Sequence, residues 1–251
     1  MIQLKGKVAL VTGGSAGLGA SISEQLAAEG VNVAINYSNN EKRASELSNR
    51  LIKLYGIESI IIKADIFDIQ NLHKLVEETV SKLGRIDILI SNAGWTEIIP
   101  YDNLDAMTEE IWDNTFSANV KAHYFLFKAV KPYFDSNKEG GTFISSASVA
   151  GRTRSGSSIP YSVSKAALIQ LIKFLAKTQP NIRTHAVCPG LLAETDWGKR
   201  FSNEQIQKSI NLSPIKKSTD IEECASEYIH LCKLSTSTGS IVASDAGLSI
   251  L

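Results

Sequence analysis

The sequence contains little cysteine, no long apolar run and no excess of charge of either sign. The three cysteines, Cys188, Cys224 and Cys232, form no CxxC motif and are odd in number, which predicts a reducing compartment and no disulfide framework. The four histidines are scattered, so no metal site is expected. No apolar run approaches the ~18 residues that cross a bilayer. The N-terminus also lacks the layout of a signal or transit peptide, and we expect a cytoplasmic protein with no membrane partner.

Positive and negative side chains balance. Lys plus Arg and Asp plus Glu both number 26, so the formal net charge is zero and no nucleic-acid surface is indicated. Apolar residues make up 43% and charged residues 21% of the chain, as in an ordinary globular protein. Because the 251 residues include no linker or low-complexity segment, one domain is expected over residues 1–251.

Apolar, strand-like runs alternate with helical stretches along the chain. Strands are expected at 7–12, 31–37, 57–63, 86–91, 142–146, 183–188 and 239–242, and helices near 20–29, 41–55, 68–83, 106–134 and 160–177. This alternation predicts right-handed crossovers and a parallel sheet with helices on both faces. The expected fold class is therefore α/β, a doubly wound parallel sheet of Rossmann type, in which ligands bind at the carboxyl ends of the strands.

A glycine-rich segment joins the first expected strand to the first expected helix. Its spacing is Gly-x-x-x-Gly-x-Gly, from Gly13 through Gly17 to Gly19. Glycine lets the backbone approach a ligand closely, and the N–H groups at a helix N-terminus attract a pyrophosphate. The segment therefore predicts a dinucleotide site that includes Ser15 and Leu18. The alternative is a glycine-rich turn that binds no ligand.

The end of the second expected strand bears on which dinucleotide binds. The residues there, which are expected to contact the cofactor, are Asn36, Tyr37 and Ser38. An acidic side chain in this region would bind the ribose of NAD and repel the 2′-phosphate of NADP. The first acid is Glu41, followed by Lys42 and Arg43, so the sequence favours NADP and keeps NAD as the alternative. The two cations are equally consistent with a solvated helix face.

Tyr161 and Lys165 are four residues apart, which on a helix places them on one face. An ammonium group beside a phenol favours the phenolate and lowers the pKa of the phenol from about 10 toward neutral pH. A tyrosine tuned in this way can donate or accept a proton. Such pairs are common on solvated helices, but Ser148 upstream and the glycine turn favour a catalytic pair.

Together these motifs resemble the short-chain dehydrogenase/reductase family over nearly the whole chain, from Lys7 to about Gly247. The matching segments are Thr12-Gly13-x3-Gly17-x-Gly19, Asp65-Ile66, Asn92-Ala93-Gly94, Asn119, Ser148 with Gly151, Tyr161-x3-Lys165 and Pro189-Gly190. The resemblance implies an enzyme that reduces a small carbonyl compound with NADP(H), or oxidises an alcohol in reverse. It also implies a homodimer or homotetramer that pairs the helices near 106–134 and 160–177.

The resemblance implies a role for each of four catalytic residues. Tyr161 would exchange a proton with the substrate oxygen, and Ser148 would hold that oxygen in place. Lys165 would lower the pKa of Tyr161 and bind the nicotinamide ribose. Asn119 would position a water that links Lys165 to solvent. The alternative for Asn119 is a structural hydrogen bond to neighbouring backbone.

The resemblance also implies cofactor contacts along the strand ends. Asp65 would accept from the adenine amino group, and Ile66 would pack on the ring. The remaining expected contacts are Asn92, Ala93 and Gly94 beside the adenosine ribose, and Pro189, Gly190, Leu192 and Thr195 near the nicotinamide or the phosphate.

Several positions depart from the family pattern. Ala16 stands where many NADP-preferring members carry a cation, which weakens the NADP prediction. Ser91 replaces the usual first asparagine of the Asn-Ala-Gly motif, so one bond between strands is in doubt. The threonine expected four residues after Pro-Gly is displaced, with Glu194 there and Thr195 following. None of these departures involves the four catalytic residues.

The segment 191–214 is expected to form a lid over the substrate. It contains Trp197, Phe201, Lys199, Arg200 and Gln205; further expected wall residues are Trp95, Ile98, Ile99, Tyr101, Arg152 and Arg154. The alternative for any one of them is ordinary lid packing or solvated charge. Two other functions remain open: a dinucleotide-binding protein without catalysis, and a dehydration or epimerisation on the same fold.

Overall fold

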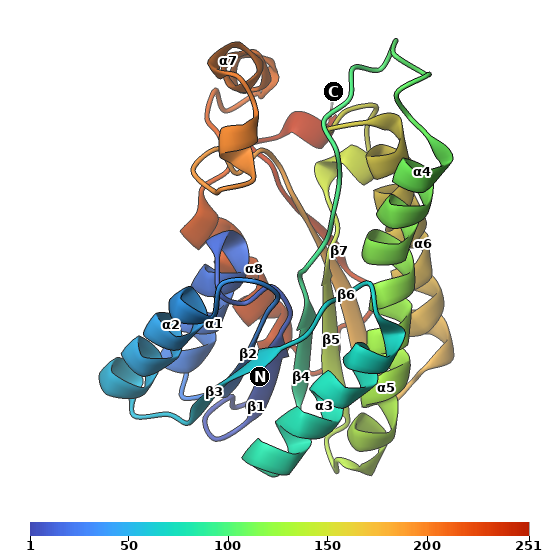
Figure 1. Cartoon of the computed structure of the whole chain (residues 1–251). Coiled ribbons are helices and arrows are strands. Elements are labelled where there is room, and N and C mark those ends of the chain that lie inside the picture. The colour runs from blue at the N-terminus through green and yellow to red at the C-terminus, as the bar shows by residue number, and fades with distance from the viewer. Residues whose placement is uncertain (251) are drawn as a thin grey trace.

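Seven strands form one parallel sheet in the computed structural model, which describes residues 1–250 (Figure 1). The strands are β1 (Val8–Val11), β2 (Asn32–Tyr37), β3 (Ser59–Lys63), β4 (Ile88–Ser91), β5 (Gly141–Ser146), β6 (Ile182–Pro189) and β7 (Ile241–Ser244). Their order is β3-β2-β1-β4-β5-β6-β7, so it reverses direction between β1 and β4. Ligands bind beyond the carboxyl ends of the strands at such a switch point. The predicted doubly wound α/β fold is confirmed.

Helices cover both faces of the sheet (Figure 1). They are α1 (Gly17–Ala28), α2 (Glu41–Tyr55), α3 (Ile69–Leu83), α4 (Glu109–Phe116), α5 (Ala122–Ser136), α6 (Ile159–Thr178), α7 (Asn203–Leu212) and α8 (Ile221–Lys233). Helices α1, α2 and α8 pack on one face, and α3, α5 and α6 on the other. Helix α7 buries no residue and lies above the carboxyl ends of the strands. Within residues 1–250, no helix is both long and apolar enough to cross a membrane.

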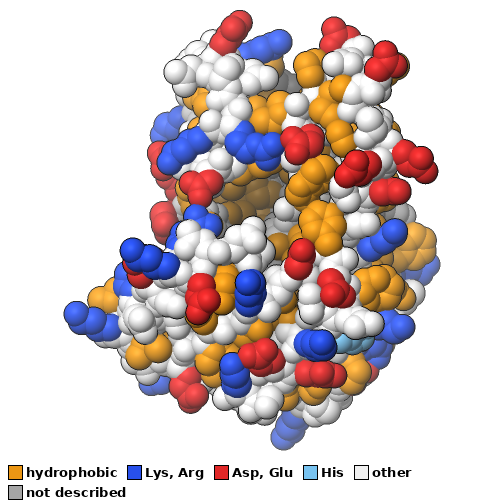
Figure 2. Space-filling model, viewed as in Figure 1, with side chains coloured by type: hydrophobic (Ala, Val, Ile, Leu, Met, Phe, Trp, Pro, Cys, Tyr) orange, Lys and Arg blue, Asp and Glu red, His pale blue; other side chains and the backbone are white. Residues whose placement is uncertain are grey.

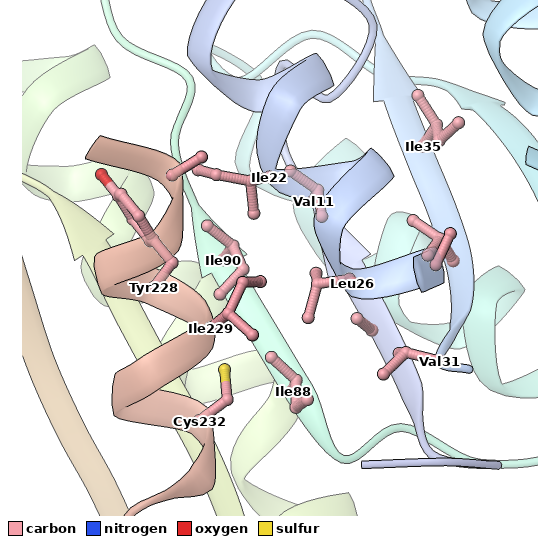
Figure 3. Packing of buried hydrophobic residues seen from close by; sticks show 14 of the residues in the cluster. Val11, Ile22, Leu26, Val31, Ile35, Ile88, Ile90, Tyr228, Ile229 and Cys232 are labelled. Carbon is pink, nitrogen blue, oxygen red and sulfur yellow. The ribbon is translucent and has the colours of Figure 1, made fainter. Parts of the chain in front are cut away.

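The core between the sheet and α1 and α8 is made of large aliphatic side chains (Figure 3). Val11 and Ile90 come from neighbouring strands, Ile22 and Leu26 from α1, and Tyr228 from α8. All five are fully buried, and burial of each of the four aliphatic side chains stabilises the fold by roughly 1.5–3 kcal/mol. This packing fixes the start of α1 relative to the end of β1, where the glycine turn lies.

Three helical features differ from the expectation, and one is α7, which forms within the segment expected as a lid. The long helix expected over 106–134 is divided by a π-helical turn, Ser117–Lys121, between α4 and α5. Helix α8 was not expected, although the sequence carries its signals. Asp220 caps it by accepting from the Glu223 N–H group at 2.8 Å, and its apolar residues recur at helical spacing.

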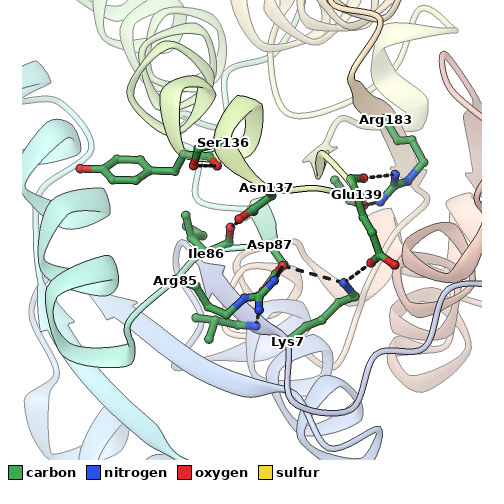
Figure 4. A network of polar contacts seen from close by, with 11 residues as sticks. Lys7, Arg85, Ile86, Asp87, Ser136, Asn137, Glu139 and Arg183 are labelled. Atoms are coloured by element: carbon green, nitrogen blue, oxygen red, sulfur yellow. Dashed lines mark hydrogen bonds and ion pairs between the residues drawn. The ribbon is translucent and has the colours of Figure 1, made fainter.

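The end of the sheet opposite the carboxyl ends is held by a polar network (Figure 4). The buried carboxylate of Asp87 accepts from the Val8 N–H group at 2.9 Å and from Arg85 at 2.8 and 2.6 Å. Lys7 lies 3.8 Å from Asp87 and donates to Glu139 at 2.8 Å. These bonds satisfy a buried charge and join β1, β4 and the loop before β5, far from the glycine turn.

Candidate active site

A cleft of about 990 Å³ lies beyond the carboxyl ends of the strands. Figure 2 shows it as a hollow beneath the lid, with hydrophobic side chains in its depth and Lys and Arg side chains on its upper edge. Its volume is at the upper end of the range for ligand sites, about 300–1,000 Å³. The glycine turn lines one part of the cleft, and Ser148, Tyr161 and Lys165 line another.

The N-terminus of α1 opens into this cleft without a side-chain cap. Helices α2, α3, α4, α6, α7 and α8 each begin with a residue whose side chain accepts from a backbone N–H group of the first turn. In α1 the capping position is Ala16, and the first turn has no acidic residue. Ala16 and Gly17 both line the cleft. An uncapped, electropositive helix end fits the pyrophosphate of a dinucleotide.

Asn36 holds the glycine turn in place from the end of β2. Its side chain is 2% exposed, and its Oδ1 accepts from the Gly13 N–H group at 3.1 Å. Its Nδ2 donates to the Ala64 carbonyl oxygen at 3.1 Å. Gly13 has a φ of 61°, and a Cβ on Gly19 would lie 2.2 Å from the Gly13 carbonyl oxygen. The turn therefore requires glycine at both positions, for conformation at the first and for space at the second.

A chain of buried hydrogen bonds joins this turn to the middle of the sheet. The Thr12 hydroxyl accepts from the N–H groups of Asn92 and Ala93 at 2.9 and 3.0 Å, and Asn92 Nδ2 donates to the Thr12 carbonyl at 3.1 Å. The Ser146 hydroxyl donates to Asn92 Oδ1 at 3.0 Å and shares a 2.7 Å hydrogen bond with the hydroxyl of Tyr228. These bonds therefore hold the glycine turn at a fixed position relative to the ends of β4 and β5.

The start of α6 places the expected catalytic pair. Ser158 caps the helix by accepting from the Tyr161 N–H group at 3.4 Å. One turn on, Lys165 is 4% exposed and donates from Nζ to the Ser146 carbonyl at 2.8 Å. Its Nζ lies 5.6 Å from the centroid of the Tyr161 ring. Ser148, Tyr161 and Lys165 all line the cleft, so the structure brings the three predicted residues together.

The pKa values of this pair are governed by burial. Burial lowers the pKa of Lys165 to about 8. Burial also raises the pKa of Tyr161, and the Ser148 hydroxyl lowers it by a smaller amount. The expectation that Lys165 lowers the pKa of Tyr161 is not met in this structure. The ammonium donates to the Ser146 carbonyl and lies against the ring, and the loss of solvation of the phenolate is the larger effect.

Asn119 lies in the π-helical turn and is fully buried. Its Oδ1 accepts from the Trp95 N–H group at 3.0 Å, and its Nδ2 donates to the Trp95 carbonyl at 2.9 Å and to Ser164 Oγ at 3.1 Å. The amide thus pairs with a stretch of backbone, as the structural alternative predicted. It holds the Asn-Ala-Gly loop beside α6.

The segment 191–214, expected to be the lid, brings aromatic side chains next to Tyr161. The rings of Trp197 and Tyr161 are stacked, with centroids 6.2 Å apart and planes inclined by 30°. Phe201 meets Trp197 edge-on at 5.8 Å, and the Arg200 guanidinium lies 5.0 Å from the Trp197 ring centroid. Arg200 also donates to Glu97 at 3.2 Å, so its charge is compensated. Trp197 is therefore positioned to exclude water from the phenol.

Residues 7–206 match the family described as short chain dehydrogenase, which is most of the chain. The chain belongs to the short-chain dehydrogenase family. The 3-oxoacyl-(acyl-carrier-protein) reductase FabG of Staphylococcus aureus (strain Mu50) is similar to this dehydrogenase, with 34% identity over 220 residues that cover 86% of this chain and 87% of the relative. The predicted family is thus confirmed.

Solved structures of other dehydrogenases share the fold. A short chain dehydrogenase from Burkholderia cenocepacia J2315, in complex with NADP, is 30% identical, with a TM-score of 0.89 and coverage of 98% of this chain and 99% of that chain. A 7α-hydroxysteroid dehydrogenase complexed with NADH and 7-oxo glycochenodeoxycholic acid is 28% identical, with a TM-score of 0.90 and coverage of 98% and 95%. This dehydrogenase is accordingly an oxidoreductase of the type that uses a nicotinamide dinucleotide.

Most residues predicted for the site of this dehydrogenase line the cleft. Those that do are Gly13, Gly17, Leu18, Asn36, Ser38, Asp65, Ile66, Asn92, Ala93, Gly94, Asn119, Ser148, Tyr161, Lys165, Pro189, Gly190, Leu192 and Thr195. Ser15, Gly19 and Tyr37 lie outside the lining, and Gly19 acts through its packing against Gly13. Within residues 1–250, no group of three His, Cys, Asp or Glu side chains is placed to hold a metal ion.

The departures from the family pattern have local explanations. Thr195, and not the exposed Glu194, faces the glycine turn, where a Cβ on Gly17 would lie 3.2 Å from the Thr195 methyl group. Thr195 Oγ1 donates to the Leu192 carbonyl at 2.8 Å, which fixes this part of the lid. The link between strands that Ser91 left in doubt is made by the bonds of Thr12 described above.

The lining of the substrate part is only partly as expected. Trp95, Tyr101, Arg154, Trp197, Phe201 and Gln205 line the cleft, whereas Ile98, Ile99, Arg152, Lys199 and Arg200 do not. Phe67, Lys208 and Leu248 also line it and were not anticipated. Phe67 directly follows Asp65 and Ile66 in the loop after β3. The place of Lys208 and Leu248 depends on how the lid and the C-terminal residues fold back over the sheet.

The lowered pKa of Lys165 gives the stability of this dehydrogenase a pH dependence. The folded state releases the Lys165 proton near pH 8, whereas the unfolded state holds it up to its ordinary value of 10.5. Between these values the unfolded state binds more protons, so stability rises with pH. The thiols of Cys188, Cys224 and Cys232 act in the opposite direction above pH 9, because burial raises their pKa values.

Comparison of the wild type with the variant Lys165→Met separates the effect of this lysine on stability from the effect of the thiols. We expect the free energy of unfolding of the wild type, relative to that of the variant, to increase from about pH 8 to about pH 10.5 in urea denaturation. The thiols are common to both proteins and cancel in the difference. A difference that stays flat or falls over this range would show that the folded pKa of Lys165 is not lowered.

Proposed function

We propose that this dehydrogenase reduces a small carbonyl compound with NADPH, or oxidises the corresponding alcohol in the reverse direction. The observation that carries the proposal is the convergence of Ser148, Tyr161 and Lys165 on one cleft with the glycine turn of α1. A protein that only bound a dinucleotide would have no need of a phenol, a hydroxyl and a buried ammonium together beside the site.

In the proposed reduction, Tyr161 donates a proton to the carbonyl oxygen. Its raised pKa keeps the phenol protonated at neutral pH, which is the form that a general acid requires. The Ser148 hydroxyl donates a hydrogen bond to the same oxygen and stabilises the negative charge that develops there. When bound, the nicotinamide supplies the hydride.

Lys165 restores the proton that Tyr161 gives away. With a pKa of about 8, its ammonium group can release a proton near neutral pH. A Cβ on Gly94 would lie 2.8 Å from Asn119 Oδ1 and 3.6 Å from Lys165 Nζ, so both side chains approach one point. The π-helical turn carries an extra residue, which displaces a backbone carbonyl from the regular helical pattern. We place there a water that connects Lys165 to solvent.

NADP is proposed as the preferred dinucleotide. Ser38, Asn39 and Arg43 line the cleft near the end of β2, and no acidic side chain of that strand end does. Hydroxyl, amide and guanidinium groups suit a 2′-phosphate, whereas a carboxylate would repel it. Among the similar structures one holds NADP and another NADH, so the local residues carry this preference.

The substrate is proposed to have an apolar body beside its carbonyl group. Trp95, Tyr101 and Trp197 form aromatic walls next to Tyr161, and Val149 adds an aliphatic surface. One similar protein is a 3-oxoacyl reductase and another is complexed with a 7-oxo compound, and the 3-oxo and 7-oxo groups are both carbonyl groups. These names support carbonyl reduction as the reaction class.

A homodimer or homotetramer in the cytoplasm is proposed from the same resemblance. Tyr124 on α5 and Val163 and Phe174 on α6 are 43%, 43% and 58% exposed. Large apolar side chains on two adjoining helices suit a two-fold interface between copies of this chain. Sedimentation that shows only a monomer would remove this part of the proposal.

Trp197 is expected to contribute to substrate binding through its contact with Tyr161. Loss of one aromatic contact costs about 0.5–1.5 kcal/mol, so Trp197→Ala should raise KM by about three- to tenfold. Trp197→Phe keeps a ring and should stay within about twofold of the wild type. Steady-state kinetics on the best substrate measures both. An unchanged KM in Trp197→Ala would show that the lid does not cover the substrate.

The proposal is tested by cofactor oxidation with purified protein. NADPH and NADH are compared against ketones, aldehydes, diketones and quinones, and the binding of each dinucleotide is measured by calorimetry. Turnover faster with NADPH is the expected result. Tight dinucleotide binding without turnover of any carbonyl would favour the alternative, a dinucleotide-binding protein without catalysis.

A further inference from the structure

An ion pair crosses the cofactor part of the cleft and joins α2 to the lid. Arg43 Nη1 lies 2.8 Å from Asp196 Oδ2, although the two residues are 153 positions apart in the sequence. Both side chains line the cleft. The pair is partly solvated, with Arg43 43% and Asp196 75% exposed, so a stronger anion can displace the carboxylate.

Both partners are held by ordered backbone. Arg43 is in the first turn of α2, where its N–H group donates to the Asn40 side chain at 2.9 Å. Asp196 follows Thr195, whose hydroxyl donates to the Leu192 carbonyl at 2.8 Å and accepts from the Gly198 N–H group at 2.9 Å. The ion pair is therefore a link between two fixed elements and not a chance meeting of two mobile side chains.

The position of the pair relates it to the ribose end of a dinucleotide. The glycine turn, which faces Thr195 across the groove, fits the pyrophosphate. Ser38 at the end of β2 lines the same region, where the adenosine ribose lies in this fold. Asp196 and Asp65 are the two acidic residues in the described lining of the cleft, and Asp65 accepts from the Phe67 N–H group at 3.0 Å.

We infer that Asp196 competes with the 2′-phosphate of NADP for Arg43, so that the lid residue sets how strongly this dehydrogenase distinguishes NADP from NAD. The inference rests on the proposed use of a nicotinamide dinucleotide. A phosphate offers up to two negative charges and three acceptor oxygens to a guanidinium, and a carboxylate offers one charge and two. The 2′-phosphate of NADP therefore replaces the Asp196 carboxylate as the partner of Arg43, and the ion pair between α2 and the lid is broken. NAD, which has a 2′-hydroxyl, leaves the ion pair in place.

The test measures dissociation constants by calorimetry for NADP, NAD and adenosine 2′,5′-bisphosphate. The variants are Arg43→Gln, Asp196→Asn and the double variant. Lys42→Gln is the matched control, because Lys42 also carries one positive charge in the first turn of α2 but is 87% exposed and pairs with Glu46. Hydrogen exchange of residues 194–200 is followed in the wild type with each dinucleotide.

Arg43→Gln is expected to weaken the binding of NADP and of the bisphosphate by about tenfold, and the binding of NAD by less than twofold. Asp196→Asn should strengthen the binding of NADP by about threefold. This gain in affinity should vanish when Arg43 is also replaced. Lys42→Gln should change neither affinity by more than about twofold. Exchange of residues 194–200 should be faster with NADP than with NAD.

Two results would overturn the inference while leaving the proposed carbonyl reduction intact. One is equal weakening of NADP and NAD by Arg43→Gln. The other is a gain in NADP affinity from Asp196→Asn that persists when Arg43 is also replaced. Such a gain would come from the removal of a nearby negative charge and not from competition for the guanidinium. If the wild type bound neither dinucleotide, the proposed function would fail together with the inference.

Discussion

Replacement of Tyr161 by phenylalanine is expected to lower kcat by about 10³-fold while the dissociation constants of the dinucleotides stay within about twofold. Positioned general acids contribute 10²–10⁴-fold, and the structure offers no second phenol in the position of Tyr161. The change removes one oxygen atom and keeps the ring, so the stacking with Trp197 is retained. Single-turnover and steady-state rates with the best carbonyl substrate measure the effect.

Tyr101→Phe is the matched control for this experiment. Tyr101 also lines the cleft, but it is 47% exposed and its hydroxyl donates to the Gly156 carbonyl at 2.6 Å. Loss of one exposed hydrogen bond should change kcat by only a few-fold. If Tyr161→Phe kept the wild-type rate, or if both variants lost activity equally, the phenol of Tyr161 would not be the proton donor.

Gly19→Ala is expected to abolish tight dinucleotide binding and to destabilise the fold. In an ordinary helix, alanine in place of glycine stabilises by about 0.5–1 kcal/mol. Here the new Cβ would lie 2.2 Å from the Gly13 carbonyl oxygen and 2.7 Å from Asn92 Nδ2. The backbone of the turn must move to accept it, and such overpacking costs about 1–3 kcal/mol. We therefore expect a loss of stability of this size and at least a tenfold loss of affinity.

Gly56→Ala separates the steric effect from a general effect of glycine replacement. Gly56 ends α2 with a φ of 64°, and a Cβ there would meet no atom within 4 Å. That variant should lose about 1 kcal/mol of stability and keep its dinucleotide affinity. Calorimetric titration and thermal unfolding of both variants give the comparison. Unchanged affinity in Gly19→Ala would mean that the turn does not hold the dinucleotide.

The parts of the fold that the sequence predicts are those with strong local periodicity. The strands were found to within about two residues, because each contains apolar residues between stretches of turn or helical residues. The π-helical turn at Asn119 was not predicted, since the local pattern is that of one long helix. Its form depends on the pairing of Asn119 with the backbone of Trp95, which comes from a distant loop.

The site residues that belong to short sequence motifs were predicted. Those that are brought together only by contacts between distant parts of the chain were missed. The sequence places Tyr161 and Lys165 on one helix face, but it does not show that burial dominates their pKa values. The charge of Arg43 and its place after β2 favoured NADP as the cofactor. Its partner Asp196 could not be predicted, because only the folded lid brings that carboxylate across the groove.

The central claim is that Tyr161 and a nicotinamide dinucleotide together reduce a carbonyl group in this cleft. The most direct test supplies NADPH that carries two deuterium atoms at C4 of the nicotinamide ring, with a carbonyl compound from the panel, and analyses the alcohol by mass spectrometry. We predict one deuterium on the carbinol carbon of each product molecule and about 10³-fold slower formation of that product with Tyr161→Phe. An alcohol without deuterium, or labelled alcohol formed equally fast by the variant, would contradict the account.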